Sequence, residues 1–505
     1  MKLAKTEHIN VSLACRELIV RGISLHLRNA GVSLVVLVIL MTPVNFTHAQ
    51  SGKPITPNLA GFDDPSGVVR TYSETGSLDM KGPFFQSLGT NGRSCGSCHQ
   101  PGDAMTVAAA HVQTRFDQSQ GLDPIFRTND GSNCDHDIDV STLAGRSAAY
   151  SLLRTRGLIR IALAVPATRD FDVTGVSNPY SCNETDVVSM YRRPLPATNL
   201  KFLSTVMFDG RESSAQTGTT PITSGNYPQS LLDDLAHQSV DATMGHAQGL
   251  APGPTTAQQQ AIVAFEMALY TGQANDNVAG SLSSLGAKGG PQAISDEGFY
   301  IGINDPVGLD PANPVPFNFS TKIFHTFDAW TNVGVPSRQA IARGQAIFNT
   351  KTFTITGVAG LNGTTFSNNV TGPQTIVSTC GICHDTPNAG NHSVSAPLNI
   401  GVADPPGGKN ALDISYLPVV TICQRPSLTT CVQTTDPGRA MITGKYADVA
   451  KFKGPILRGL AARAPYFHNG SAQTLQDIVT FYDARFQIGF TAQEKSDLIA
   501  FLNSL

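Results

Sequence analysis

The sequence is poor in charge and in aromatic side chains. Charged residues make up 14% and aromatic residues 7% of the 505-residue chain, which has a single tryptophan. Its 35 Lys and Arg are outnumbered by 38 Asp and Glu, the formal net charge is −3, and no basic stripe is visible. Because nucleic-acid binding depends on clustered positive charge, the composition predicts no nucleic-acid partner. The 41% of apolar residues is enough for a folded chain.

The sequence also lacks an apolar run long enough to span a bilayer, which takes about 20 residues. The apolar stretch near the N-terminus extends only from Ala30 to Met41, and small residues follow at Thr47 and Ala49. Five basic residues precede it: Lys2, Lys5, Arg16, Arg21 and Arg28. This order is typical of an export signal. We expect residues 1–49 to be a signal peptide and the mature protein to be periplasmic or secreted, without a stable membrane anchor; an uncleaved anchor is the alternative.

Cysteine is scarce but informative in its positions. Of nine cysteines, one lies in the expected signal and four belong to a repeated motif. The remaining four are an even number in an exported chain, which indicates disulfides. We predict a local bridge between Cys423 and Cys431 and a loop bridge between Cys134 and Cys182. Four free buried thiols are the alternative.

The repeated motif is C-x-x-C-H, which occurs in "RSCGSCHQ" (93–100) and "STCGICHD" (378–385) and nowhere else. A single zinc site would need four ligands around one ion, but the two motifs lie far apart in the sequence. A thioredoxin-like site would open a helix after a strand, and neither motif follows a clear strand in the sequence. Covalent haem fits better, because two thiols on one turn can add to the vinyl groups of one porphyrin while the next histidine binds its iron. We therefore predict two covalent c-type haems, held by Cys95, Cys98 and His99 and by Cys380, Cys383 and His384.

Helices are expected around these motifs. Apolar periodicity and capping residues predict helices over 255–272, 337–349, 474–486 and 491–505, with Thr474 and Thr491 as N-caps. The 47 glycines and 31 prolines imply many turns, and 352–366 reads as a hairpin. We expect a mainly α fold with two cytochrome c-like haem domains carrying long loops and insertions, an N-terminal one over 50–330 and a C-terminal one over 331–505.

Three stretches resemble a known family. "KGPILRGLAARAPYFHNGSAQTLQDIVTFYD" (453–483), "MFDGRESS" (207–214) and "ARGQAIFN" (342–349) resemble segments of the bacterial di-haem cytochrome c peroxidases, a group that includes MauG. The resemblance implies an exported oxidoreductase in which hydrogen peroxide or another small oxidant reacts at the N-terminal haem. It also implies that the C-terminal haem relays electrons from a small donor protein.

The resemblance further implies a sixth ligand for the C-terminal haem on the helix after the PYFHNG block. The peroxidases place Met there and MauG places Tyr, and the matching position in this chain is Tyr482. A phenolate stabilises ferric iron, so a tyrosine ligand predicts a low-potential haem. The alternatives are that Tyr482 is only a core residue of its helix and that another residue, such as Met441, is the ligand.

The chain departs from the family pattern at two places. The Trp of the family's W-D-G-R segment is Phe208 here, and the residue aligned with its distal Glu is Gln248. Gln cannot shuttle a proton as Glu does. His246, two residues earlier, could act as the base instead, could bind the iron of the N-terminal haem, or could be a helix-end histidine. His111 is another possible sixth ligand of that haem, or a surface histidine.

The resemblance also implies calcium between the domains, bound partly by the carbonyls of Arg463 and Pro465. The function classes left open are a peroxidase-like enzyme, an oxygenase of the rubber-oxygenase type, and an electron carrier without catalysis. An open or exchangeable N-terminal haem would indicate an enzyme, whereas two haems closed by strong ligands would indicate a carrier.

Overall fold

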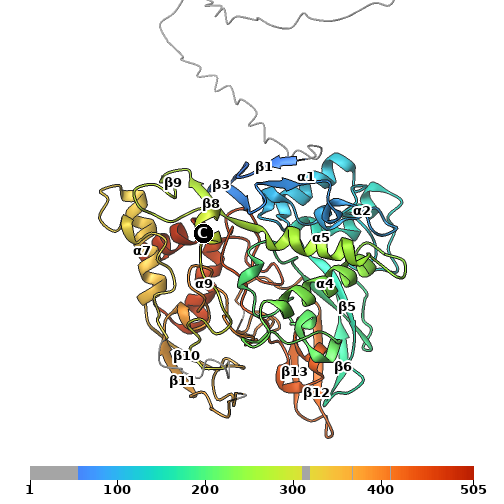
Figure 1. The fold of residues 1–505 in the computed structure, drawn as a ribbon. Helices are drawn as coiled ribbons and strands as arrows, with labels where there is room; N and C mark the ends of the chain where they lie inside the picture. The colour runs from blue at the N-terminus through green and yellow to red at the C-terminus, as the bar shows by residue number, and fades with distance from the viewer. Residues whose placement is uncertain (1–54, 310–318, 367, 410) are drawn as a thin grey trace, which may run out of the picture. The chain divides into compact units, whose positions relative to one another are not determined.

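The computed structural model describes residues 55–309, 319–366, 368–409 and 411–505 (Figure 1). The expected signal peptide at 1–49 lies outside these ranges. Within them, no helix is both long and apolar enough to cross a membrane. The α-helices are α1 (Ala109–Ser119), α2 (Leu143–Ala149), α3 (Ser151–Arg156), α4 (Gln229–Gly245), α5 (Thr256–Met267), α6 (Pro291–Ser295), α7 (Pro336–Thr350), α8 (Ala440–Thr443), α9 (Leu475–Phe486) and α10 (Ala492–Asn503).

Thirteen strands accompany these helices in the described residues. They are β1 (Ile55–Pro57), β2 (Gly61–Asp64), β3 (Gly67–Ser73), β4 (Ser77–Asp79), β5 (Ile159–Ala164), β6 (Phe171–Ser177), β7 (Val187–Arg192), β8 (Leu269–Asp276), β9 (Gly280–Ser281), β10 (Phe353–Thr356), β11 (Thr375–Ser378), β12 (Val419–Gln424) and β13 (Cys431–Thr434). They pair as five small sheets, in the orders β1-β4, β2-β3-β8-β9, β5-β7, β13-β12-β6 and β10-β11.

The expectation of a mainly α fold is therefore wrong. The described residues are 29% helical and 17% strand, and the strands are spread over the chain (Figure 1). The missed strands are short and rich in β-branched residues, such as "GVVRTYS" in β3 and "VVSMYR" in β7. Segments of that length gain their stability from a partner strand far away in the sequence, so their own pattern is weak.

The last two predicted helices are confirmed at their starting residues. Thr474 and Thr491 each accept a hydrogen bond from the backbone three residues on, and Asp477 and Glu494 complete the capping boxes. The predicted helix 255–272 instead ends at Met267, and β8 begins two residues later. The β-sheet partners of Leu269 to Gly272 lie in β3, so pairing replaces the last helical turn.

The predicted hairpin at 352–366 is correct only in its first strand. Phe353–Thr356 form β10, but their partner is β11 at Thr375–Ser378, directly before the second haem motif. Helix α7 extends one residue beyond the predicted range 337–349 at each end, and Pro336 opens it.

The core clusters mix the two halves of the chain. Residues of the segment 403–450, including Ala403, Val420 and Met441, pack in one cluster with Phe171 and Met190. Strand β12 pairs directly with β6, which holds this segment against the N-terminal half. A second large cluster joins α7, α9 and α10 to the residues around Trp330. The division into haem domains at 330/331 stays a prediction.

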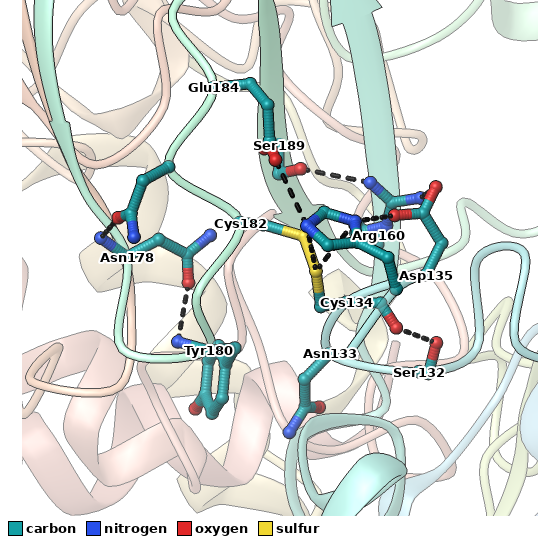
Figure 2. Close-up of a disulfide and its surroundings, with 12 residues drawn as sticks. Ser132, Asn133, Cys134, Asp135, Arg160, Asn178, Tyr180, Cys182, Glu184 and Ser189 are labelled. Carbon is teal, nitrogen blue, oxygen red and sulfur yellow. Dashed lines mark hydrogen bonds and ion pairs between the residues drawn. A yellow bond between two sulfur atoms is a disulfide. The ribbon is translucent and has the colours of Figure 1, made fainter. Parts of the chain in front are cut away.

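Both predicted disulfides are confirmed. Cys423 and Cys431 face each other across β12 and β13. Cys134 and Cys182 join two loops next to Asp135 and Arg160, as Figure 2 shows. The four cysteines of the two motifs remain free thiols.

Helices α7 and α10 cross closely at Gly344, which positions Phe348 of α7 at the second motif's cavity. A Cβ atom at Gly344 would overlap the backbone oxygen of Asp497 and lie 2.6 Å from the Cβ of Phe501. We expect Gly344→Ala to lower the free energy of unfolding by ~1–3 kcal/mol, because the backbone of α10 has to shift. This cost exceeds the ~1 kcal/mol that alanine gains in helix propensity.

Chemical denaturation of the haem-loaded protein would measure this change. Gly245→Ala in α4 is the matched control, since a Cβ there meets nothing within 4 Å among the described residues. The control should be neutral or slightly stabilising. Equal stability of the two variants would contradict the close helix crossing.

Candidate functional site

The first C-x-x-C-H motif lies at the edge of a large cavity. Its cysteines flank a short 3-10 turn, η2 (Cys95–Ser97), and His99 follows. The cavity encloses about 1580 Å³ of atom-free space, including its open mouth. The apolar residues that line it include Ile159, Ile161, Leu200, Leu203, Val206 and Leu235.

The second motif repeats this arrangement. A 3-10 turn, η9 (Cys380–Ile382), precedes His384 at a cavity of about 1700 Å³. Its lining is again mostly apolar, with Phe348, Phe353, Phe467, Phe486 and Phe490 among its residues. Two distant parts of the chain have thus formed the same local structure, each opening on a cavity of a similar size.

Each motif histidine is fixed in the tautomer that a metal ligand needs. The Nδ1–H of His99 donates to the carbonyl of Met105 at 2.8 Å, and that of His384 donates to the carbonyl of Gly390 at 2.6 Å. The acceptor lies six residues after the histidine in both cases. Burial lowers the pKa of His384 to about 4 and also lowers that of His99. Both imidazoles are therefore neutral, with Nε2 available as a ligand atom.

The motif cysteines are chemically distinct from the other four. Burial raises the pKa of Cys95 and of Cys380 to about 12, so both are protonated thiols at neutral pH. They stay unpaired although their C-x-x-C partners are close in sequence. Unpaired thiols at the rim of an apolar cavity fit covalent attachment to a large apolar group with reactive double bonds.

The two cavities share a wall. Six residues line both: Arg193, Pro194, Leu195, Phe208, Lys453 and Pro455. Phe208, at the position of the family's Trp, also contacts the ring of His468 edge-on at 6.0 Å. Groups bound in the two cavities would therefore be separated by one layer of side chains.

Two buried cations of this wall, Lys453 and Arg193, form no ion pair within 4.0 Å among the described residues. Burial lowers the pKa of Lys453 to about 7 and that of Arg193 to about 9. Their hydrogen bonds go to carbonyls, for example from Lys453 Nζ to Thr205 at 2.8 Å. Arg458, which lines the first cavity, has an Nη1 atom without a hydrogen-bond partner among the described residues. Buried donors of this kind indicate a bound group with carboxylates, as a porphyrin with its propionates would supply.

His246 reaches the first cavity from the end of α4. Its Nδ1–H donates to Asp130, which also accepts from the guanidinium of Arg93. Burial opposes ionisation of Asp130, but His246 and Arg93 outweigh it and lower the pKa of that carboxyl. Asn91 donates to the backbone carbonyl of His246 at 2.8 Å and helps to hold the residue. Asp130 therefore orients the imidazole through Nδ1, so that Nε2 is the ring nitrogen left for a bound group.

The other two residues predicted for this haem do not line the cavity. Gln248 is exposed, has a left-handed backbone with φ 52°, and accepts hydrogen bonds from Thr90 through its carbonyl. His111 is half-exposed on α1 and pairs with Asp103. Three described residues were predicted to act at the N-terminal haem: His246, Gln248 and His111. Of these three, only His246 lines the cavity.

Two acidic residues of the first cavity were missed. No pattern in the sequence indicated Asp130, because its partner His246 is 116 positions away. Glu266 is an acid on the buried face of α5, and this position could have been found in "AIVAFEMAL". Its Oε2 has no partner within the described part of the chain, and burial raises its pKa to about 8. Glu266 is therefore largely protonated at neutral pH.

Tyr482 lines the second cavity from α9, among the rings of Phe467, Phe481 and Phe486. Burial raises the pKa of its phenol. Met441, the alternative ligand, is packed in a different core cluster and does not line this cavity.

Two further histidines do line the second cavity, His392 and His468. His392 donates to Asp385 at 2.9 Å, and its Nε2 has no hydrogen-bond partner among the described residues.

The carbonyl of Arg463, named above for calcium, accepts from the guanidinium of Arg193 at 2.8 Å. A cation of the protein itself thus occupies that carbonyl, so the residues present do not favour calcium there.

The comparisons with known proteins agree in part with these features. No family model matches the chain. It is 41% identical over 81 residues to "Cytochrome-c peroxidase IdrP1" of Pseudomonas sp. (strain SCT), which is 14% of this chain and 21% of that protein. It is 40% identical over 77 residues to "Cytochrome c551 peroxidase" of Nitrosomonas europaea, 14% of this chain and 23% of that protein.

A third relative is "Cytochrome c peroxidase Ccp" of Escherichia coli, 37% identical over 76 residues, 15% of this chain and 16% of that protein. Among solved structures, a MauG-like protein associated with microbial copper homeostasis is 16% identical, with a TM-score of 0.34 over 84% of this chain and 87% of that one. The chain matches about a fifth of the length of its first curated relatives. The comparisons therefore confirm that it resembles the bacterial cytochrome c peroxidases, over a limited part of its length.

Proposed function

We propose that this chain is an exported di-haem c-type oxidoreductase that acts on hydrogen peroxide or another small oxidant. The observation that carries the proposal is the repeated unit of two thiols and an oriented histidine, present at two large apolar cavities with a common wall. Cys95, Cys98 and His99 would hold one haem, and Cys380, Cys383 and His384 the other. When bound, the haems supply redox-active iron to each cavity.

The residues of the first cavity suit proton handling. His246 presents Nε2 to the cavity because its Nδ1–H is committed to Asp130. Such a nitrogen can take a proton from one oxygen of a peroxide molecule and return it to the other. The protonated carboxyl of Glu266 is a second possible proton donor in the same cavity.

The residues of the second cavity suit electron transfer. Tyr482 is the proposed sixth ligand there, and Phe208 and Lys453 lie in the wall between the cavities. Electrons would enter from a small donor protein at the second haem and pass through this wall to the first. The peroxidase names of the partial relatives support peroxide as the oxidant.

The first test of this proposal is the number of haems. Two motifs with free thiols predict that the exported protein carries two covalently attached haems, seen by haem staining on a denaturing gel and as two haem increments in the intact mass. Replacing Cys95 and Cys98 by alanine should remove one increment, and replacing Cys380 and Cys383 should remove the other. A wild-type mass with one haem or none would contradict the proposal.

A further inference from the structure

One histidine and two carboxylates meet where α4 contacts the short turn η5 (Arg211–Ser213). The Oε2 atom of Glu212 lies 2.9 Å from His237 Nδ1, and the Oδ2 atom of Asp241 lies 4.0 Å from the same nitrogen. The three potential ligand atoms all lie within 4.8 Å of one another. His237 and Asp241 are four residues apart on α4, so one rigid helix face presents both.

The acids of this cluster, and the neighbouring Asp234, have few cations near them. Glu212 is 2% exposed, and Asp234, which lies next to the cluster on α4, is 1% exposed. The Oδ2 atom of Asp234 has no hydrogen-bond partner among the described residues. Arg211 is 3.8 Å from Glu212 and also pairs with Asp209 at 3.2 Å. Buried carboxylates with so few cations nearby indicate that a further cation binds there.

We propose that Glu212, His237 and Asp241 bind a divalent transition-metal ion of the zinc class. Zinc takes one imidazole nitrogen and carboxylate oxygens at about 2.0–2.2 Å, whereas calcium prefers oxygen ligands alone. On binding, the Nδ1 proton of His237 goes to solvent and its lone pair faces the metal. The side chains of His237 and Asp241 are 41% and 57% exposed, which leaves an entry path and room for water ligands.

The site has a structural consequence for the first cavity. Helix α4, whose C-cap is His246, supplies Leu235 and Gln238 to the cavity lining, and Arg211 of η5 lines the same cavity. A metal bound between α4 and η5 would tie the helix that carries His246 to the segment next to Phe208. The site itself does not depend on the proposed reaction.

Equilibrium dialysis of the haem-loaded protein against zinc, followed by elemental analysis, tests the site directly. We expect a zinc site in the wild type that calcium at equal concentration does not displace. His237→Ala and Asp241→Asn should each weaken zinc binding by more than ~10-fold, since even outer partners of a metal site contribute that much. Asp233→Asn is the matched control, because Asp233 is an exposed acid of α4 outside the cluster.

Thermal unfolding gives a second readout, because a ligand that binds the folded state raises its stability. Zinc should raise the melting temperature of the wild type and of Asp233→Asn, and should leave His237→Ala unchanged. The absorption spectrum of the haems controls for intact folding in each variant. The proposal is overturned if the wild type binds no zinc, or if His237→Ala and Asp241→Asn bind it as tightly as the wild type.

Discussion

Replacing His246 by alanine is expected to lower peroxide turnover by ~10²–10⁴-fold, the usual contribution of a positioned general acid–base. The reason is its place in the first cavity, where Asp130 holds Nδ1–H and leaves Nε2 free to accept a proton. Steady-state oxidation of a reduced donor at saturating peroxide would measure the loss. Asp130→Asn should cause a smaller loss, because the imidazole remains but its orientation is no longer fixed.

Gln248 provides the matched control for this prediction. It lies two residues from His246 but is exposed, so Gln248→Glu should leave turnover unchanged. A large gain in Gln248→Glu would instead restore the role of a distal acid to that position. The ferric spectrum of His246→Ala at rest separates two roles of the histidine: a base leaves the spectrum unchanged, whereas an iron ligand alters it. Full activity in His246→Ala would exclude the role of a base.

Tyr482→Phe is expected to change the low-spin ferric spectrum of the second haem and to open a coordination position. The phenol has to lose its proton to bind ferric iron well, and burial alone raises its pKa. The positive charge of the iron would have to lower the pKa of the phenol by more than burial raises it. A phenolate lowers the reduction potential, so Tyr482→Met should raise it clearly in a potentiometric titration.

Tyr466→Phe is the control for the second haem. Tyr466 lines the same cavity, but its hydroxyl donates to the carbonyl of Leu460 at 2.9 Å, so its loss should leave the spectrum unchanged. An unchanged spectrum in Tyr482→Phe as well would exclude the tyrosine. His392 and His468 would then be the next ligands to test, since both line this cavity, whereas Met441 does not.

Most features that the sequence predicted correctly depend on neighbours along the chain; the bridge between Cys134 and Cys182, 48 residues apart, is the exception. The capping boxes at Thr474 and Thr491 lie within one helical turn. The bridge between Cys423 and Cys431 closes a short loop. In each C-x-x-C-H motif the two cysteines flank one turn, so the chemistry of the motif follows from spacing alone.

The tertiary structure decided the features that join distant segments. The sheet of β3 and β8 required pairing across some 200 residues, which no local periodicity reports, and it ended the predicted helix 255–272 early. The contact of His246 with Asp130 also joins residues far apart in the sequence, so no local pattern reports it. Gln248 has a left-handed backbone and is exposed, whereas His246, two residues earlier, lines the cavity. The sequence thus predicted which residues would hold the proposed haems, because these residues follow from spacing along the chain. Only the fold determined which polar side chains face the cavities, because long-range packing sets the direction of each side chain.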